Sequence, residues 1–177
     1  MNIEASGRHT LSPTNKKEYP LVIDNFFPEG IHYEIWNRLI EPGWSLNGGI
    51  PDNPFWHYDR LQEQEYFRDF LYEKICERLG KKFSGIKRIY ANGQTSGQCG
   101  NPHYDDGDLT FLYYPNLEWD IKWQGHLIFL ENMEPSQVIS YKPNRAVIFP
   151  GDMWHYADAP SRVYNGLRIS LAYKLWK

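Results

Sequence analysis

Three side chains in the second half of the chain have the types and the spacing needed to hold a metal ion. His103 and Asp105 lie two residues apart on a segment expected to be extended, so both point to one face. His155 follows a hydrophobic run that ends at Pro150, where a strand stops and the chain restarts after a turn. Two imidazoles and one carboxylate, with other coordination positions open, suit Fe(II) and oxygen chemistry better than a closed structural zinc site.

The last predicted strand adds a cation to this set. Its residues alternate, so that one face carries Leu167, Ile169, Leu171 and Tyr173, while the other carries Arg168, Ser170 and Ala172. A buried arginine needs an anionic partner, and a ligand carboxylate held by two parallel hydrogen bonds is a suitable one. The sequence therefore predicts a metal site with an anion site beside it.

Taken in order, His103-x-Asp105, His155 and Arg168-x-Ser170 resemble the motif of the Fe(II)- and 2-oxoglutarate-dependent oxygenases. The segment Leu109 to Trp119, with Tyr113-Tyr114-Pro115-Asn116 inside it, is similar to the prolyl hydroxylase branch, as is Trp123 to Leu127. The resemblance covers residues 86–176. Two residues depart from the family pattern: Pro115 stands where a leucine usually follows the tyrosine pair, and Gln124 stands where a glycine usually precedes Gly125.

The resemblance implies Fe(II), 2-oxoglutarate and O2 as cofactor and cosubstrates, with ascorbate as a supporting reductant. Iron would be held by His103, Asp105 and His155, whereas Asp106 and Asp108 are interpreted as turn residues. Four residues are implied for 2-oxoglutarate, with Arg168 on its far carboxylate: Arg168, Tyr114, Tyr90 and Ser170. His126 follows Gly125, and it would lie near the site if the strand that begins there is a neighbour of the site.

The implied reaction is hydroxylation of a protein or peptide side chain, with proline as the first candidate and succinate and CO2 as coproducts. Two alternatives stay open: the same chemistry on a nucleobase or small metabolite, and an oxygenase-like barrel that only binds. Zinc hydrolase and cupin interpretations fit less well, because they expect other ligand sets. Three tryptophans are predicted to face the substrate: Trp44, Trp56 and Trp154. The loop from Trp44 to Tyr58 is either a substrate flap or a segment that packs its rings into the core.

Hydrophobic periodicity predicts a mainly β fold with flanking helices. Apolar residues recur at helical spacing from Pro28 to Pro42 and from Asp59 to Leu79, and Gly80 ends the second helix. The core-facing stripe of the first helix is predicted to contain Ile31, Ile35, Trp36, Leu39 and Ile40, and that of the second Leu61, Phe67, Phe70, Leu71, Ile75 and Leu79. Seven strands are predicted at Leu21–Ile23, Ile86–Tyr90, Leu109–Tyr114, Leu127–Leu130, Val138–Tyr141, Arg145–Phe149 and Gly166–Trp176. The resemblance makes this a double-stranded β-helix, or jelly roll, with the N-terminal helices packed on one sheet.

Length and composition set the remaining bounds. A chain of 177 residues suits a single domain, here predicted as a loose leader (1–19), a strand and helical support (20–84) and the β-helix core (85–177). The formal net charge of −3 gives no global field for nucleic acid, so a nucleic-acid partner is not expected. Cys76 and Cys99 match no disulfide or zinc framework, and no signal peptide or membrane span is found, which predicts a soluble cytoplasmic protein.

Overall fold

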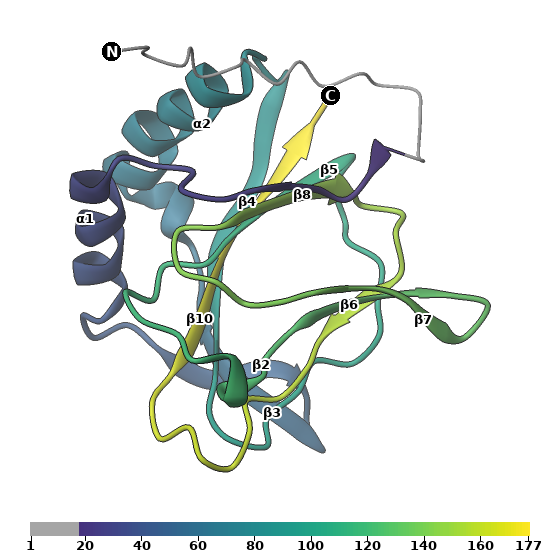
Figure 1. Ribbon diagram of the computed structural model, residues 1–177. Helices are drawn as coiled ribbons and strands as arrows, with labels where there is room; N and C mark the ends of the chain where they lie inside the picture. Colours follow the sequence, from purple (N-terminus) through teal and green to yellow (C-terminus); the bar gives the residue numbers. More distant parts are fainter. Residues whose placement is uncertain (1–17) are drawn as a thin grey trace, which may run out of the picture.

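The computed structural model describes residues 18–177, so most of the predicted leader lies outside the described residues. Strands dominate, in two antiparallel sheets (Figure 1). They are β1 (Leu21–Ile23), β2 (Ser45–Ile50), β3 (Asn53–Tyr58), β4 (Gly85–Gln94), β5 (Leu109–Tyr113), β6 (Leu127–Glu131), β7 (Glu134–Ile139), β8 (Ala146–Pro150), β9 (His155–Ala157) and β10 (Arg168–Trp176). The larger sheet has the order β1-β8-β5-β10-β4-β3-β2, and the smaller has the order β7-β6-β9. This is the predicted jelly-roll arrangement.

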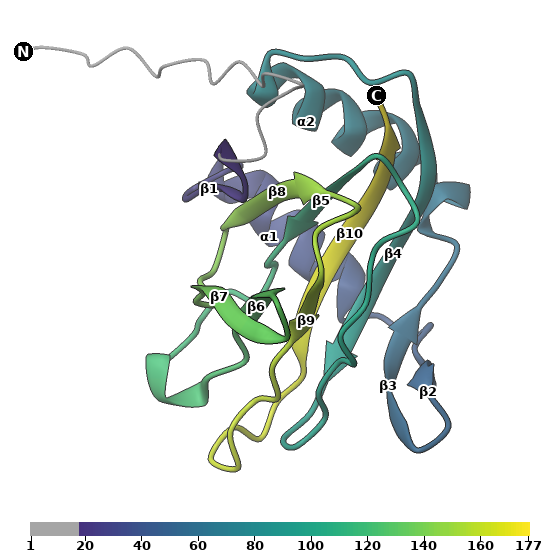
Figure 2. The same ribbon diagram turned by 90° about the vertical axis from the view of Figure 1, so that its right-hand side faces the viewer.

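Helices cover one face of the larger sheet (Figures 1 and 2). They are α1 (Glu29–Leu39), the π-helical η3 (Tyr66–Leu71) and α2 (Tyr72–Leu79), with short 3-10 turns at η2 (Leu61–Glu63) and η4 (Ile121–Trp123). Their apolar side chains form one core with the residues of β4, β5 and β10 that point toward them. A second, smaller core lies between the two sheets and contains Tyr114, Leu127, Phe129, Tyr141, Val147 and Phe149. The predicted packing of helices on one sheet is confirmed.

The strand register explains why the face of β4 and β10 that points away from the helices is largely polar. In the pairing of β10 with β4, Arg168 lies opposite Gln94, Ser170 opposite Asn92, and Lys174 opposite Arg88. Opposed residues of an antiparallel pair share a face, whereas their neighbours along each strand point to the opposite side. Ile169, Leu171 and Tyr173 therefore join the helical core, as the alternation predicts.

Three predicted details are wrong in an informative way. The expected loop from Trp44 to Tyr58 is a β-hairpin, because β3 pairs with β4 and β2 pairs with β3. The helical stripe from Leu61 to Leu79 includes Leu61, Phe67, Leu71, Ile75 and Leu79 but not Phe70, which is 40% exposed. The π-helical turn changes the phase there, so that burial recurs every four residues. Ile40, also expected in the core, caps α1 and is 53% exposed.

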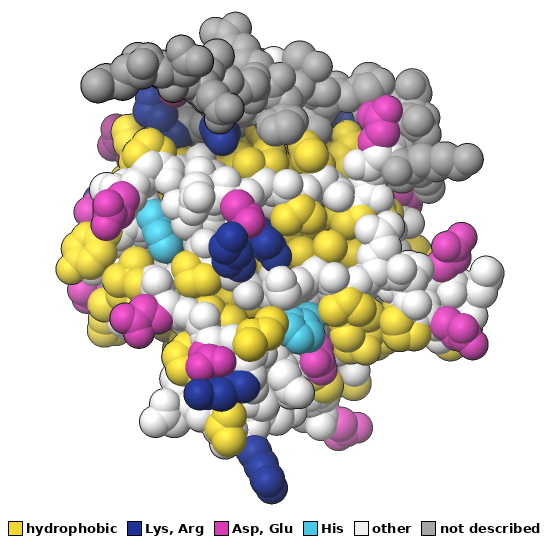
Figure 3. All heavy atoms as spheres, in the orientation of Figure 1, with side chains coloured by type: hydrophobic (Ala, Val, Ile, Leu, Met, Phe, Trp, Pro, Cys, Tyr) yellow, Lys and Arg dark blue, Asp and Glu magenta, His cyan; other side chains and the backbone are white. Residues whose placement is uncertain are grey.

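The surface carries charges of both signs. On the face drawn in Figure 3, Lys and Arg side chains are scattered among acidic and apolar ones and do not form a continuous basic patch. Among residues 18–177, no helix is long and apolar enough to cross a membrane.

Candidate metal centre and anion site

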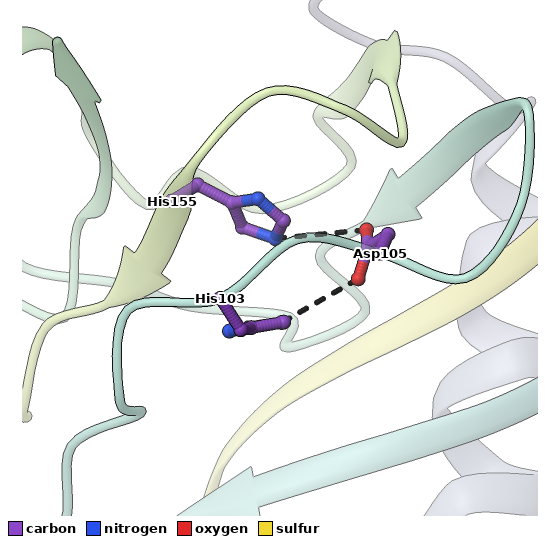
Figure 4. A group of neighbouring side chains, drawn as sticks. All are labelled: His103, Asp105 and His155. Atoms are coloured by element: carbon purple, nitrogen blue, oxygen red, sulfur yellow. Dashed lines mark ion pairs between the residues drawn. The ribbon is translucent and has the colours of Figure 1, made fainter.

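The structure brings His103, Asp105 and His155 together, as the sequence predicts (Figure 4). One ligand atom from each lies within 4.8 Å of the other two. His103 Nε2 is 3.4 Å from Asp105 Oδ1, and His155 Nε2 is 3.6 Å from Asp105 Oδ2. Such a group of two imidazoles and one carboxylate can coordinate a divalent transition metal on one side and leave other positions open.

Backbone hydrogen bonds hold the three residues in place. His103 and His155 exchange a reciprocal pair of N–H to carbonyl bonds, at 3.0 and 3.1 Å, which joins the loop before β5 to the start of β9. The Asp105 N–H donates to the Gly151 carbonyl at 2.8 Å. No side-chain atom could fit at Gly151, because a Cβ would lie 2.0 Å from the carbonyl oxygen of Gly107. The turn after β8 therefore positions Asp105.

The tautomer of both histidines follows from their second nitrogen. His103 Nδ1 lies 2.8 Å from the Asn101 carbonyl oxygen, and His155 Nδ1 lies 2.8 Å from the Met153 carbonyl oxygen. A carbonyl oxygen can only accept, so each Nδ1 carries the hydrogen and each neutral ring keeps its Nε2 lone pair for a metal. These are the supporting bonds that metal-binding histidines need and that the sequence does not identify.

Electrostatics favour the deprotonated carboxylate and a neutral His155. Burial acts to raise the pKa of Asp105, but the hydrogen bond with His103 and the charge of Lys174 outweigh it and hold that pKa well below its ordinary value. Burial lowers the pKa of His155 to about 4. The hydrogen bond with Asp105 raises the pKa of His103. At neutral pH, Asp105 and His155 are therefore in their metal-binding forms.

Lys174 is a site residue that sequence reasoning missed. Its side chain and that of Asp105 are each 3% exposed, and its Nζ atom forms an ion pair with Asp105 Oδ2. Thr110 Oγ1 lies 3.1 Å from Lys174 Nζ and donates to Asp105 Oδ2 at 2.5 Å. The sequence does contain one indication of this role, because the alternation along β10 places Lys174 on the same face as Arg168 and Ser170. Asp106, by contrast, pairs with Lys87 at 3.4 Å and stays outside the metal group.

Arg168 is fully buried and lies in a fixed position at the start of β10. Its Nε donates to the Gly125 carbonyl and its Nη1 to Gln94 Oε1, both at 2.8 Å. A Cβ at Gly125 would lie 2.9 Å from Arg168 Cδ, so the glycine permits this approach. Gln124 adopts φ 58° and ψ −129°, so the turn forms although a glycine would fit it better.

Among the buried polar atoms that lack a partner within residues 18–177 are Arg168 Nη2 and Tyr114 Oη. The Arg168 guanidinium carbon lies 5.5 Å from the centre of the Tyr114 ring. Buried donors without acceptors are costly, so their presence points to a bound anion that would accept from both. A carboxylate fits, because it can accept two hydrogen bonds from this pair. His126 Nδ1, one residue after Gly125, is also buried without a partner among these residues.

The remaining predicted residues fall into two groups. Tyr90 and Ser170 line a cavity of about 490 Å³ that also contains His103 and Asp105. Trp44 does not line it: its ring packs against the helical core, and its Nε1 donates to the Leu39 carbonyl. Trp56 alternates with the cavity residues Phe55 and His57 and so points to the other face of β3.

Trp154, the third tryptophan predicted to face the substrate, is not among the cavity residues. It stacks on the cavity residue Tyr104, with ring centres 6.3 Å apart. The segment from Trp44 to Tyr58 was predicted either to face the substrate or to pack into the core, and different residues of it do each. Trp44 packs inward, while Asn47, Gly48, Gly49, Ile50, Phe55 and His57 of the hairpin line the cavity.

No family model matches the sequence, and no curated protein matches it. Solved structures do match. A prolyl hydroxylase from Trichoplax adhaerens, in complex with a hypoxia-inducible factor peptide, has a TM-score of 0.63 and 19% identity, over 88% of this chain and 82% of that one. A viral collagen prolyl hydroxylase from Paramecium bursaria Chlorella virus 1, in complex with 2-oxoglutarate, has a TM-score of 0.66 and 15% identity, over 89% and 95%.

The non-heme α-ketoglutarate-dependent carbocyclase SnoK from nogalamycin biosynthesis has a TM-score of 0.70 and 12% identity, over 96% of this chain and 87% of that one. The chain therefore has the jelly-roll fold of the Fe(II)- and 2-oxoglutarate-dependent oxygenases, in agreement with the fold expected from its sequence. At these identities the similarity concerns the fold, and the activity has to be argued from the site.

Proposed function

We propose that this protein is an Fe(II)- and 2-oxoglutarate-dependent dioxygenase that hydroxylates a protein or peptide side chain, with proline as the first candidate. The observation that carries the proposal is the combination of two sites on one fold. His103, Asp105 and His155 form a metal-binding group, and Arg168 with Tyr114 presents buried donors that lack an acceptor within residues 18–177. A divalent metal and a dicarboxylate are what such a pair of sites would hold.

The chain's own residues would prepare the site before any reaction. His103 and His155 present Nε2 lone pairs because backbone carbonyls hold their Nδ1 hydrogens. Arg168 is held by Gly125 and Gln94, so its Nη2 is fixed in place for the far carboxylate of 2-oxoglutarate, and the Tyr114 ring centre lies 5.5 Å from its guanidinium carbon. Tyr90 and Ser170 would border the cosubstrate from the cavity. When bound, iron and 2-oxoglutarate supply the oxidising chemistry, with O2 as the oxidant.

A small-molecule substrate is the second candidate. The cavity of about 490 Å³ is enclosed on one side by the β2–β3 hairpin and has the size of a small-ligand site. Prolyl hydroxylases and a carbocyclase share the fold, so the fold does not choose between these substrates. The single-domain organisation and the cytoplasmic location stay predictions from the sequence.

An anaerobic titration with Fe(II) and 2-oxoglutarate tests the proposal. We expect the wild type to develop the weak visible metal-to-ligand charge-transfer band of a chelated cosubstrate. His103→Ala should abolish the band, and Arg168→Gln should require at least 10-fold more 2-oxoglutarate, because it removes a charge-assisted contact. Arg162→Gln, an exposed change of equal charge, is the matched control.

The outcome separates the three interpretations. A wild type that binds neither iron nor 2-oxoglutarate would identify a binding module without oxygenase chemistry. If the band forms, a panel of proline-containing peptides is incubated with O2 and searched by mass spectrometry for the gain of one oxygen atom. Succinate formed with small acids but with none of the peptides would favour the second candidate.

A further inference from the structure

One face of β4 lines the same cavity as the metal ligands His103 and Asp105. Arg88, Tyr90, Asn92 and Gln94 alternate along this strand, and all four line the cavity. Their polar side chains continue the face that carries Ser170 and Lys174 on β10. The hairpin β2–β3 borders the same space from the other edge of β4. A molecule in the cavity could therefore contact both the metal ligands and this row of polar groups.

Every cation around the metal group except Arg88 already has a use. Lys174 pairs with Asp105, and Lys87 pairs with Asp106. Arg168 donates to Gly125 and Gln94, and its remaining nitrogen is assigned to the cosubstrate. The Arg88 backbone pairs with β10, but its side chain forms no ion pair within residues 18–177, and its buried Nε atom lacks a hydrogen-bond partner there. The free charge of the cavity is thus a guanidinium.

Packing fixes where this guanidinium lies. Its central carbon stacks 4.3 Å above the Tyr90 ring, and the Lys174 ammonium lies 5.5 Å from the same ring. Arg88 is the direct cross-strand neighbour of Lys174, which contacts Asp105. Adjacent strands are about 4.8 Å apart, so Arg88 lies one strand away from the residue that touches a metal ligand. An anion on Arg88 would lie in the cavity that His103 and Asp105 also line.

We propose that Arg88 binds a carboxylate of the substrate, so that the enzyme acts on an organic acid. This rests on the proposed function and names its substrate class. A guanidinium presents parallel N–H donors that match a carboxylate, and stacking on Tyr90 keeps its plane oriented. Asp105 and Asp106 also line the cavity, which favours a singly charged carboxylate over a doubly charged phosphate.

The same chemistry has two sources, a free small acid and an acidic residue or C-terminus of a peptide. The first experiment therefore uses two small probes that differ only in the presence of the negative charge. Zn(II) and N-oxalylglycine, an unreactive analogue of 2-oxoglutarate, saturate the metal and the cosubstrate site of the whole protein. Trifluoroacetate and trifluoroacetamide, which have the same shape and differ in charge, are then titrated by fluorine NMR.

We expect trifluoroacetate to bind the wild type about 10- to 100-fold more tightly than the amide, the range for a hydrogen bond to a charged group. Arg88→Gln should reduce this ratio to about one. Arg88→Lys should retain part of it, because the charge stays while the parallel donors are lost. Arg162→Gln, the exposed control, should leave the ratio unchanged.

An equal affinity for both probes in the wild type, or an unchanged ratio in Arg88→Gln, would overturn the proposal and assign any binding to the metal. Failure of the proposed function has a different signature, because the wild type would then bind no N-oxalylglycine. In that case the probe titration is repeated without N-oxalylglycine.

A second pair of ligands identifies the source of the acid. Tighter binding of acetyl-prolyl-glutamate amide would indicate an acidic peptide, and tighter binding of N-acetylproline would indicate a free acid.

Discussion

Replacing Lys174 by methionine removes one partner of a buried ion pair and keeps the length of the apolar side chain. Both side chains of the pair are 3% exposed, so water cannot take the place of the ammonium at Asp105. Removing one partner of such a pair costs about 3–5 kcal/mol, because the other charge stays buried. Thr110 still donates to Asp105 Oδ2 at 2.5 Å, which places the expected loss at about 3 kcal/mol.

Urea denaturation of the metal-free protein, with EDTA present, measures this loss. Lys122→Met is the matched control, because Lys122 pairs with Asp120 at 3.0 Å while its side chain is 68% exposed. An exposed pair of this kind contributes at most about 1 kcal/mol. The double variant with Asp105→Asn should be more stable than the sum of the two single losses predicts, since neither charge is then left alone.

Zn(II) should restore more stability to Lys174→Met than to the wild type, because the metal supplies the positive charge that Asp105 has lost. A free energy of unfolding for Lys174→Met within about 1 kcal/mol of the wild type would contradict the expected loss. Additive losses in Lys174→Met and Asp105→Asn would contradict it as well, because the two charges would then not depend on each other.

Three further changes test the supports of the site. Gly151→Ala should destabilise the protein by about 1–3 kcal/mol in urea and weaken Zn(II) binding, since its Cβ would lie 2.0 Å from the Gly107 carbonyl oxygen and displace Asp105. The pKa of His155 is lowered to about 4 in the folded protein, so the unfolded chain binds the proton first as the pH falls below about 6.5. The free energy of unfolding of the metal-free protein should therefore fall by about 3 kcal/mol by pH 4, and by less in His155→Asn. Gln124→Gly should raise stability in thermal denaturation by about 1 kcal/mol, since φ 58° strains a residue with a side chain.

The metal group was predictable because local spacing and chain order carry it. His103 and Asp105 share a face on any extended segment, and the hydrophobic run before Pro150 marks the turn that leads to His155. The alternation of β10 separates Arg168 from its apolar neighbours in the same way. Lys174 follows the same alternation, yet a lysine near a strand end is usually exposed, and only the pairing of β10 with β5 shows that it faces Asp105.

The features that were missed depend on contacts between distant segments. The segment from Trp44 to Tyr58 is rich in Gly and Pro and has the composition of a loop, but β4 pairs with β3 and makes it a hairpin. Trp56 and His57 then point to opposite faces, so His57 rather than Trp56 lines the cavity. Arg88 lies in a predicted strand whose two faces the sequence does not distinguish, and its place on the cavity wall follows from the register with β10.

The two sheets meet at the metal group through a short bridge. His103 and Asp105 precede β5 of the larger sheet, whereas His155 begins β9 of the smaller one. A metal ion held by all three would act as a cross-link between the sheets, closing a loop of about 50 residues much as a disulfide does. In a chain-entropy model such a closure contributes about 4 kcal/mol. Metal loading would thus govern how firmly the smaller sheet stays attached, and chelation would loosen β6, β7 and β9 before the helix-covered sheet.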